Sequence, residues 1–566
     1  DRIEYANRTF LNLLDIKSET DILKEKFLKL VAREDWEFLA ENIGEMLINN
    51  EAMEIRLVTA GHKILKVKFD AMYLSDNQHF TFILIGERII PKTVTAMGMY
   101  DPVTGLPNFY LFEDRVQVAV NYENYKDIRQ RKNMIAVIGI GIDNFPALKT
   151  IGMHELVLKK LAEGIRGRRT ELAAILAEEQ AKTLPLAQVE VDFTAEYFDY
   201  YAGWARIYEG EIIQSDRPRE NILLYRQPIG VVAGICPWNF PLFVTARKVA
   251  PSLLAGCAVV VKPSSVAPVT VMEFAKIAAG LDLPRGILNV VTGGGARLGE
   301  ALAKSPLTDM VSLTGSVEAG QRIITAGAAN ITKVSLELGG KAPAIVCADA
   351  DLDLAAKAVT ASRVIFSGQV CNCAERVYVH ESIADAFAEK LVRAFEAVRL
   401  GDPFDEPAPD MCSQINAEQL AKIEGMVRRA RADGAEAVTG GAPADRKTGY
   451  FYMPTLLRNC RQDMEIVRKE IFGPVLPMLT FRDFDEAIAL ANDCEYGLTS
   501  SIYTSNVSLA MEAVNRLKFG ETYVNRENFE GMQGFHAGWR KSGIGGADGK
   551  HGLLEYLQTH VAYIQY

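Results

Sequence analysis

Three short segments near the start of the chain have strand-like patterns, and two of them alternate hydrophobic and polar positions. The runs Met53–Leu57 and Leu65–Phe69 place an apolar side chain at every second position, and His79–Ile85 forms a third strand-like run. A period of two indicates a strand with one buried face, so the pattern predicts an antiparallel sheet with one solvent-facing side. Helical patterns around residues 9–14 and 35–47 complete a small α+β module.

From about residue 158 the pattern changes to buried-type strands that alternate with helices. Leu158, Leu161 and Ile165 lie on one helical face, and the run Lys159–Arg169 suits a helix in either piece of the chain. Such alternation with glycine-rich turns predicts an α/β fold with a parallel sheet, which binds ligands at the C-terminal ends of its strands. The strands are expected at 229–235, 257–261, 287–291, 310–313 and 334–338, with helices at 247–254 and 269–279.

Composition supports a division into two unrelated pieces that join near residues 150–170. All eight cysteines lie at or beyond Cys236, and alanine and glycine are much sparser before residue 150 than after it. The length of 566 residues predicts about three or four domains. We therefore expect two differently built parts within one multidomain chain.

Charge and hydropathy exclude several classes of protein. Sixty-two Lys and Arg against 72 Asp and Glu give a net charge of −10, which argues against a nucleic-acid partner. No apolar run reaches the ~18 residues of a membrane span, and no secretory signal opens the chain. We expect a cytoplasmic protein without a membrane partner, whose cysteines are mostly core residues. Because the chain starts at Asp1, its N-terminus is expected to be trimmed or incomplete.

The first segment resembles a sensor domain. The stretch Ile3-Glu4-Tyr5-Ala6-Asn7, followed by Phe10 and Leu13, resembles the opening of PAS domains, and Arg33-Glu34-Asp35 resembles their mid-domain turn. The resemblance implies a PAS-like sensor segment over residues 1–97. Another small α+β fold is the alternative.

Residues 98–157 resemble part of a GGDEF (diguanylate cyclase) domain. Asp101–Asn108 is similar to the opening motif of that family, and the run Met134–Ile142 followed by Asp143 is similar to its first metal-binding strand. In that family an Asp here would hold Mg²⁺, but Asp143 can equally cap a strand end. The signature Gly-Gly-Asp/Glu-Glu-Phe is missing, so we expect a truncated segment without cyclase activity and predict no metal site.

Five blocks in the second piece carry the candidate chemistry. Ser367–Cys371 puts a cysteine behind a small flexible turn, where a thiolate can be exposed. Glu337–Lys341 places a carboxylate at a strand end beside two glycines, and Pro237–Pro241 fixes an amide between two prolines. Val261–Ser264 puts a lysine just past a strand, and Glu470–Pro474 adds a carboxylate beside an aromatic ring. Taken alone, each block has a structural explanation, and a cysteine is more often inert packing.

These blocks, in this order and spacing, resemble the aldehyde dehydrogenase superfamily over residues 158–566. The resemblance implies a Rossmann-type cofactor domain at 158–338, an α/β catalytic domain at 339–540, and a C-terminal return at 541–566. Within the superfamily, the stretch 525–540 is most similar to bacterial lactaldehyde/glycolaldehyde dehydrogenases. Because the family's first strands and helices would precede this region, we expect an N-terminally incomplete cofactor domain and a fusion of two families.

The resemblance implies NAD(P)-dependent oxidation of an aldehyde to its carboxylic acid. Cys371 would attack the aldehyde carbon, since a thiolate is both a strong nucleophile and a good leaving group. The Asn239 amide and the Cys371 backbone N–H would hold the oxyanion. Glu337 would activate the water that hydrolyses the thioester.

The resemblance also implies a site for NAD or NADP. Backbone N–H groups between a strand and a helix suit a pyrophosphate, and a lysine and a glutamate would bind ribose hydroxyls. A glycine-rich turn alone is weak support, since it is often only a loop. The residues assigned to the cofactor are Trp238, Lys262, Ser264, Ser265, Gly293, Gly295, Gly315, Ser316, Leu338, Glu470 and Phe472.

One position departs from the family pattern. NAD-preferring members usually carry Glu after Lys-Pro-Ser, where it repels the 2′-phosphate of NADP. This chain has Ser265 there. A hydroxyl removes that repulsion, so we expect NADP to be accepted and NAD to remain usable.

Four polar residues are expected near the acyl pocket: Arg247, Asn372, Glu530 and His536. They would hydrogen-bond the 2-hydroxyl of a short hydroxyaldehyde. Alternatively, they form surface ion pairs or a satisfied core histidine. Cys373, two residues past the nucleophile, is expected to pack in the core.

Strand-like segments at 211–214, 222–226 and 562–565 match the family's oligomerisation sheet. The resemblance therefore implies a homodimer or homotetramer. A signalling protein of the PAS/GGDEF type with an inactive or passenger dehydrogenase portion is the rival interpretation, and a fusion with neither activity intact is a third.

Overall fold

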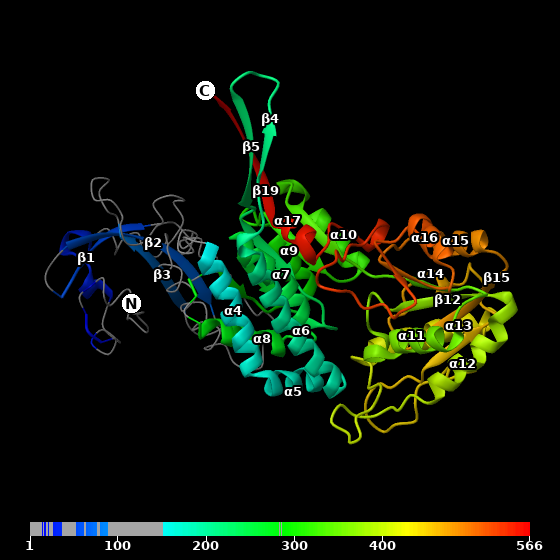
Figure 1. The fold of residues 1–566 in the computed structure, drawn as a ribbon. Helices are drawn as coiled ribbons and strands as arrows, with labels where there is room; N and C mark the ends of the chain where they lie inside the picture. The colour runs from blue at the N-terminus through cyan, green and yellow to red at the C-terminus, as the bar shows by residue number, and fades with distance from the viewer. Residues whose placement is uncertain are drawn as a thin grey trace. The chain divides into compact units, whose positions relative to one another are not determined.

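The computed structural model describes residue 14, residues 16–18, 21, 27–36, 53–60, 64–75 and 80–88, and residues 151–566 except 282 and 285. The chain forms two compact units, Asp1–Asp143 and Asn144–Tyr566 (Figure 1). The motifs predicted at 3–13 and 101–108, the run 134–142 and Asp143 lie outside the described residues, as do most residues of the helices predicted around 9–14 and 35–47.

The first unit contains the predicted antiparallel sheet. Its order is β1 (Met53–Val58), β2 (Ile64–Ser75) and β3 (Phe80–Arg88), with both pairings antiparallel. Leu57 is fully buried between two half-buried neighbours, as a period of two requires. β2 extends beyond the predicted run because its C-terminal half pairs with β3.

Three helices open the second unit. They are α4 (Ile151–Gly167), α5 (Arg169–Gln180) and α6 (Leu184–Gly203). The predicted face of Leu158, Leu161 and Ile165 is fully buried in α4. The helix begins earlier than predicted, so residues 151–157 form its first turns.

A six-stranded sheet follows, in the order β18-β10-β9-β6-β7-β8. All neighbours are parallel except β18, and the order reverses between β6 and β9, as in doubly wound folds. The five parallel strands confirm the predicted ones, because strands buried on both faces produce continuous apolar runs. Their bounds are β6 Val231–Ile235, β7 Ala258–Lys262, β8 Leu288–Val290, β9 Met310–Thr314 and β10 Lys333–Glu337, with β18 at Gly543–Ile544.

Four helices connect these strands: α7 (Pro241–Ala255), α8 (Val269–Ala279), α9 (Gly295–Lys304) and α10 (Val317–Gly327). α8 has the predicted bounds. α7 begins at Pro241 and not at Arg247, because proline suits the first turn of a helix. Every residue of α7 is buried, so its sequence lacks the polar face that marks a surface helix.

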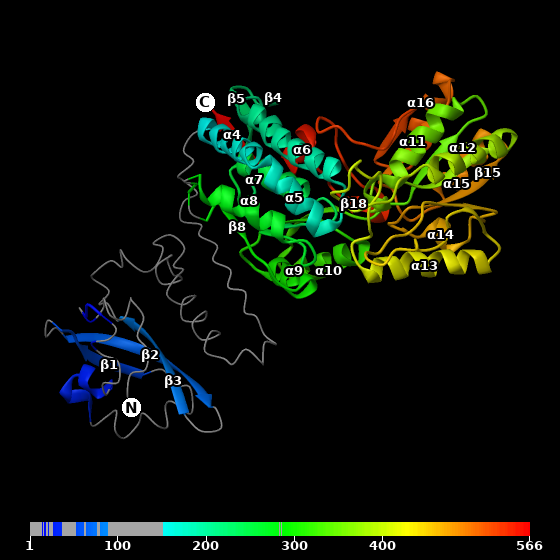
Figure 2. The same cartoon turned by 90° about the horizontal axis from the view of Figure 1, so that it is seen from below.

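The remaining chain builds a seven-stranded sheet, in the order β13-β14-β15-β12-β11-β16-β17. Only the pairing of β13 with β14 is antiparallel. Figure 2 shows the helices of this sheet gathered in a lobe beside the lobe of α4–α10. The strands are β11 Ala342–Val346, β12 Ala374–His380, β13 Glu436–Thr439, β14 Thr455–Arg458, β15 Val475–Phe481, β16 Thr499–Tyr503 and β17 Glu521–Val524; the helices are α11 Leu352–Val364, α12 Ala384–Glu396, α13 Ala417–Ala432, α14 Glu465–Arg468, α15 Phe484–Asn492 and α16 Val507–Arg516.

A three-stranded antiparallel sheet confirms the strands predicted for oligomerisation. Its order is β19 (Leu557–Gln565), β5 (Glu220–Pro228) and β4 (Glu211–Gln214), and α17 (Gly549–Glu555) leads into it. The sheet projects from the lobe of the six-stranded sheet (Figure 1). Several of its apolar side chains are exposed; they are Ile212, Ile213, Tyr225, Val561, Tyr563 and Ile564.

Candidate active site

Cys371 follows a strained turn between α11 and β12. Phe366 and Ser367 have φ angles of 45° and 57°, and Gly368 has 74°. The left-handed region costs a residue with a side chain on the order of 1–3 kcal/mol, so this turn must be held by its surroundings. Cys371 is half-buried and carries a free thiol.

A buried arginine holds this turn. Arg363 is fully buried and donates hydrogen bonds to the carbonyl oxygens of Gly368, at 2.5 Å, and of Ala374, at 2.9 Å. Its guanidinium also pairs with Glu375 at 2.9 Å. The backbone on both sides of Cys371 is thereby fixed.

Cys371 lies against the end of the six-stranded sheet. A Cβ atom at Gly340 would lie 2.5 Å from the carbonyl oxygen of Cys371, so only glycine permits this approach. Asn239 Nδ2 donates to the carbonyl of Gln369 at 3.0 Å, two residues before the cysteine. The structure therefore brings Cys371 together with Asn239, after β6, and with the strand end that carries Glu337.

Glu337 is a buried carboxylate with one free oxygen. Its Oε2 accepts a hydrogen bond from Lys248 Nζ at 2.7 Å and another from the Thr314 hydroxyl, whereas Oε1 has no partner. Burial alone would raise the pKa of Glu337, but the positive charges of Lys248, Arg247 and His536 outweigh it and lower the pKa to about 2. Glu337 is thus ionised at neutral pH, with one buried oxygen that lacks a hydrogen-bond partner.

A buried ion pair fixes the backbone of Asn239. Lys182 is fully buried, pairs with Glu190, and donates to the carbonyl oxygen of Asn239 at 2.8 Å. Its ammonium lies 3.8 Å from the ring centroid of Phe240 and 4.5 Å from that of Phe366. Glu190 also accepts two N–H groups at the start of α7. This pair locks the loop that carries the predicted oxyanion donor.

We expect Lys182→Met to lower the free energy of unfolding by about 3 kcal/mol, because it leaves Glu190 as an uncompensated buried charge. Lys276→Met is the matched control: Lys276 is exposed and pairs with Glu273 at the surface. That change should cost less than about 1 kcal/mol. Urea unfolding of both variants measures the difference, and equal midpoints would contradict the expectation.

The predicted cofactor residues gather at one edge of the six-stranded sheet. The parallel register aligns Ile235 with Lys262 and Leu313, and Thr314 with Glu337, so these strands end together. Ser316 is the N-cap of α10. The residues at or just after the strand ends are Trp238, Lys262, Ser264, Ser265, Gly293, Gly315, Ser316 and Leu338, and Gly295 begins α9.

The lobe of the seven-stranded sheet carries the two remaining predicted cofactor residues, Glu470 and Phe472. Glu470 Oε1 accepts the N–H of Gly340 at 2.9 Å, and a Cβ atom at Gly339 would lie 2.7 Å from Glu470 Oε2. Burial, with the neighbouring carboxylate of Glu375, raises the pKa of Glu470 to about 7. Phe472 meets Trp238 edge to face, with ring centroids 5.5 Å apart. Both lobes therefore contribute to one site.

The four predicted substrate residues are also brought together. Arg247 is buried and not at the surface; it pairs with Glu530 at 2.7 Å and with Asp548 at 2.6 Å. Asn372 donates from Nδ2 to the same Glu530. His536 is buried, and its Nδ1 lies 2.6 Å from Glu521 Oε1. The surface ion-pair alternative is wrong for Arg247.

Sequence reasoning missed the charged residues that partner this site: Lys182, Glu190, Lys248, Glu521 and Asp548. Only Lys248 carried a signal, as a lysine beside Arg247 in a helical run that is otherwise mostly apolar. The prediction for Cys373 is confirmed, because it is buried among Phe366 and Val370. Five of the eight cysteines are buried.

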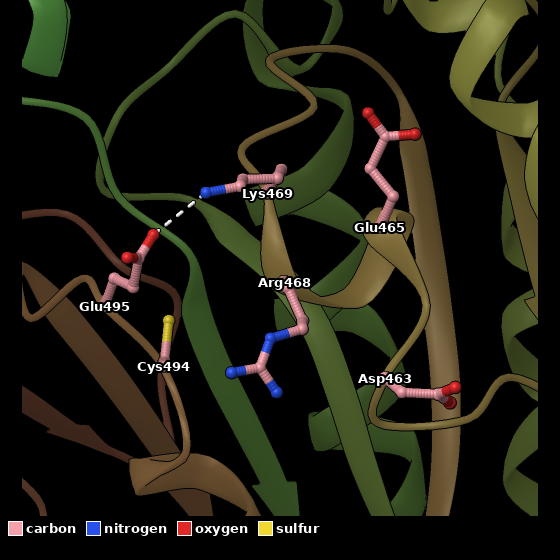
Figure 3. Close-up of a pocket in the computed structure, with 6 residues that line it drawn as sticks. All are labelled: Asp463, Glu465, Arg468, Lys469, Cys494 and Glu495. Carbon is pink, nitrogen blue, oxygen red and sulfur yellow. Dashed lines mark hydrogen bonds and ion pairs between the residues drawn. The ribbon is translucent and has the colours of Figure 1, made fainter.

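A separate surface pocket carries paired charges (Figure 3). Its Lys469 binds Glu495 at 2.9 Å, and Arg468 binds Asp493 at 3.0 Å. Lys541 also binds Glu495, at 2.6 Å. The predicted site residues are not among its lining side chains, which are Asp463, Glu465, Arg468, Lys469, Cys494 and Glu495.

Within the part of the chain that the structure describes, no group of three or more His, Cys, Asp or Glu residues is placed to hold a metal ion. Among the described helices, none is long and apolar enough to cross a membrane.

Comparison with known proteins identifies the second unit. The sequence model of the "Aldehyde dehydrogenase family" matches residues 144–562. Lactaldehyde dehydrogenase of Escherichia coli (strain K12) is 58% identical over 408 residues, which cover 72% of this chain and 85% of that protein. D-glyceraldehyde dehydrogenase (NADP(+)) of Thermoplasma acidophilum is 36% identical over 487 residues, covering 85% of this chain and 95% of that protein.

A crystal structure of lactaldehyde dehydrogenase from Escherichia coli superimposes with a TM-score of 0.74 at 56% identity, covering 75% of this chain and 89% of that one. The α/β fold predicted from the strand and helix pattern is thereby confirmed. The PAS-like and GGDEF-like resemblances of the first unit stay predictions. The chain belongs to the aldehyde dehydrogenase family.

Proposed function

We propose that this enzyme oxidises a short 2-hydroxyaldehyde to its carboxylic acid, with Cys371 as nucleophile and NAD or NADP as hydride acceptor. The observation that carries the proposal is the meeting of Cys371, Asn239 and Glu337 beside a buried polar network that contains Arg247.

The side chains suit consecutive steps of acyl transfer. Cys371 forms a thiohemiacetal and, after hydride loss, a thioester. Asn239 donates one amide hydrogen to Gln369, which fixes the amide and leaves the second hydrogen for the oxyanion beside the Cys371 N–H. Glu337 takes a proton from the hydrolytic water on Oε1, while Lys248 holds the other oxygen.

The strand ends fit a dinucleotide. When bound, the nicotinamide ring supplies the hydride acceptor. Ser316, the N-cap of α10, offers its backbone N–H to a pyrophosphate, whereas the N–H of Gly315 is engaged by the carbonyl oxygen of Glu337. Lys262 and Glu470 would bind ribose hydroxyls; the absence of a side chain at Gly339 leaves room for the Glu470 carboxylate.

The substrate class follows from the polar network. Arg247, Asn372 and Glu530 bond one another in a polar network on the acyl side of the site, and such a network would favour a substrate hydroxyl over an alkyl chain. The two relatives above are named for lactaldehyde and D-glyceraldehyde, and both of these compounds are 2-hydroxyaldehydes.

NAD(P)H formation by the full chain tests this function. We expect kcat/KM for lactaldehyde to exceed that for propanal by on the order of 10²-fold or more, because the two aldehydes differ only in the hydroxyl that the network would bind. Glycolaldehyde should also be oxidised. Equal values for lactaldehyde and propanal would refute the substrate class, and no turnover with any aldehyde would refute the function.

The Ser265 side chain is exposed, and a Cβ atom added at Gly295 would lie 4.0 Å from its Oγ. We expect Ser265→Glu to lower kcat/KM for NADP by about 30-fold, through roughly 2 kcal/mol of repulsion between the carboxylate and the 2′-phosphate. As a control, kcat/KM of the same variant for NAD should differ little from that of the wild type. A wild-type kcat/KM that strongly favours NAD over NADP would contradict the prediction that Ser265 allows NADP to be accepted.

We further propose the domain division made from the sequence, with a PAS-like segment at residues 1–97 and a truncated GGDEF-like segment at 98–157. We also propose that the chain assembles into a homodimer or homotetramer through β4, β5 and β19. The antiparallel β1–β3 sheet supports the PAS-like segment, and the exposed side chains of Ile212 and Tyr563 support the assembly. GTP or cyclic dinucleotide binding without aldehyde turnover would instead favour the signalling interpretation.

A further inference from the structure

Asp548, in the turn before α17, holds Arg247 with both of its carboxylate oxygens. Arg247 donates from Nε to Oδ1 at 3.1 Å and from Nη2 to Oδ2 at 2.6 Å, and the Tyr197 hydroxyl donates to Oδ1 at 2.8 Å. All three side chains are buried. Burial raises the pKa of Asp548, and the guanidinium of Arg247 opposes that rise. Both oxygens accept hydrogen bonds, which is the pattern of an ionised carboxylate.

The backbone of Asp548 is strained in the position that makes this contact. Its φ is 73° and its ψ is 160°, a region that residues with a side chain rarely adopt. The residues on either side of it are fixed. Ala547 exchanges two backbone hydrogen bonds with His536, each of 2.9 Å, and Gly549 N–H donates to the carbonyl oxygen of Met532 at 2.9 Å. The neighbouring chain therefore imposes the strain and keeps the carboxylate on Arg247.

Arg247 is shared with a second carboxylate. Its Nη2 also donates to Glu530 Oε1 at 2.7 Å. Asn372, the residue directly after Cys371, donates to the other oxygen of Glu530. Arg247, Asp548 and Glu530, named here the Arg247 cluster, are thereby connected to the residue that follows the nucleophile.

The Arg247 cluster carries one more negative than positive charge, since one guanidinium faces two carboxylates. The charged groups beside it are paired with one another. Lys248 binds Glu337 at 2.7 Å, and His536 binds Glu521 at 2.6 Å, so neither pair offsets that negative charge. Charges act more strongly in a buried site than in water. A substrate carboxylate near the cluster would be repelled, whereas a hydroxyl could hydrogen-bond to it.

We propose that Asp548 sets the charge selectivity of the acyl pocket: it neutralises Arg247, so that the site accepts uncharged hydroxyaldehydes and discriminates against aldehydes that carry a carboxylate. This inference deepens the proposed oxidation of a 2-hydroxyaldehyde and rests on it. Asp548 is a positioning residue, because it acts through Arg247. Without its charge, Arg247 keeps only Glu530 as a charged partner, and its Nε is freed for an anion.

Alkylation of Cys371 by iodoacetate and by iodoacetamide measures this selectivity without aldehyde or cofactor. The sulfur displaces iodide from either reagent, and the two differ only in a carboxylate against an amide. Because the same thiolate attacks both, the ratio of the two rates reports the charge near the sulfur. In Asp548→Asn we expect the iodoacetate/iodoacetamide ratio at Cys371 to rise by about tenfold. Asn also tolerates positive φ, so this change suits the turn.

Matched variants separate charge from packing. Tyr197→Phe removes a hydrogen bond to the same carboxylate and no charge, so it should leave the ratio unchanged. Glu530→Gln removes the other negative charge of the Arg247 cluster and should raise the ratio as well. It keeps the test decisive if thermal melting shows that Asp548→Asn is unfolded. Peptide mass spectrometry of the full chain also follows the half-buried Cys494, whose ratio should be the same in every variant.

Steady-state kinetics gives the second measurement. Glyoxylate carries a carboxylate where glycolaldehyde carries a hydroxymethyl group, and both concentrations are corrected for the hydrated aldehyde. We expect the ratio of kcat/KM for glyoxylate to that for glycolaldehyde to rise by about tenfold in Asp548→Asn and to stay at the wild-type value in Tyr197→Phe.

Unchanged alkylation ratios in the folded charge variants would overturn the proposal. An equal rise in Tyr197→Phe would also overturn it, because a loosened turn and not a lost charge would then admit the anion. A raised alkylation ratio without a raised kinetic ratio in an active enzyme would show that the charge does not select the substrate. A raised alkylation ratio in a chain that oxidises no aldehyde supports the charge assignment, and the proposed function alone then fails.

Discussion

Cys371→Ala is expected to abolish NAD(P)H formation with glycolaldehyde, with kcat falling by at least on the order of 10⁴-fold. Without the thiol no covalent adduct forms, and hydride would have to leave from a free hydrate that no side chain orients. The strained turn from Phe366 to Gly368, which Arg363 holds, fixes the backbone just before this cysteine. The measurement is absorbance of the reduced cofactor under saturating aldehyde.

Cys373→Ala is the matched control for this change. Cys373 is two residues away, is 1% exposed, and packs among Phe366 and Val370. Its loss should reduce stability through a small cavity and leave turnover within a fewfold of wild type. If Cys371→Ala retained turnover comparable to that of Cys373→Ala, the nucleophile would have been misassigned.

Glu337→Gln should separate the two halves of the reaction. We expect kcat to fall by about 10²–10⁴-fold, because the hydrolytic water loses its base. The first turnover should survive, since attack and hydride loss do not need Glu337. A rapid burst of NAD(P)H equal to the number of sites should therefore precede slow turnover, and acid quenching should trap an acyl group on Cys371 for mass spectrometry.

The control for Glu337→Gln is the exposed Glu527→Gln, which should show neither a burst nor a lower kcat. Loss of the burst in folded Glu337→Gln would mean that Glu337 acts before hydride leaves. The substitution also unpairs the buried Lys248, so thermal melting is needed to exclude unfolding as the cause.

Local sequence patterns predicted much of the fold. Strands β6–β10 are short apolar runs because helices cover both faces of their sheet, and in β1 the buried Leu57 lies between half-buried neighbours. Helix starts were less accessible. α7 begins at Pro241, earlier than predicted, because a helix that is buried all round shows no amphipathic period. α4 begins at Ile151, also earlier than predicted, because the exposed apolar side chains of Met153 and Leu156 obscure the amphipathic period of its first turns.

The residues proposed to react could also be recognised in the sequence, since Cys371, Glu337 and Asn239 lie in short blocks whose glycines and prolines indicate unusual backbone. The sequence by itself therefore determined the family resemblance and the candidate groups for the reaction. What it did not contain was the charge environment of those groups.

Only the tertiary structure decided that environment. Lys248 reaches Glu337 across 89 positions of the chain, and Lys182 reaches the loop of Asn239 across 57. Glu521 is 15 residues from His536 and meets it only because β17 and the loop after it fold against each other. Electrostatic partners are chosen by distance in space, and burial sets how strongly they act. Neither the distances between these groups nor their burial can be read from the order of residues. The protonation of the site therefore depends on the folded structure.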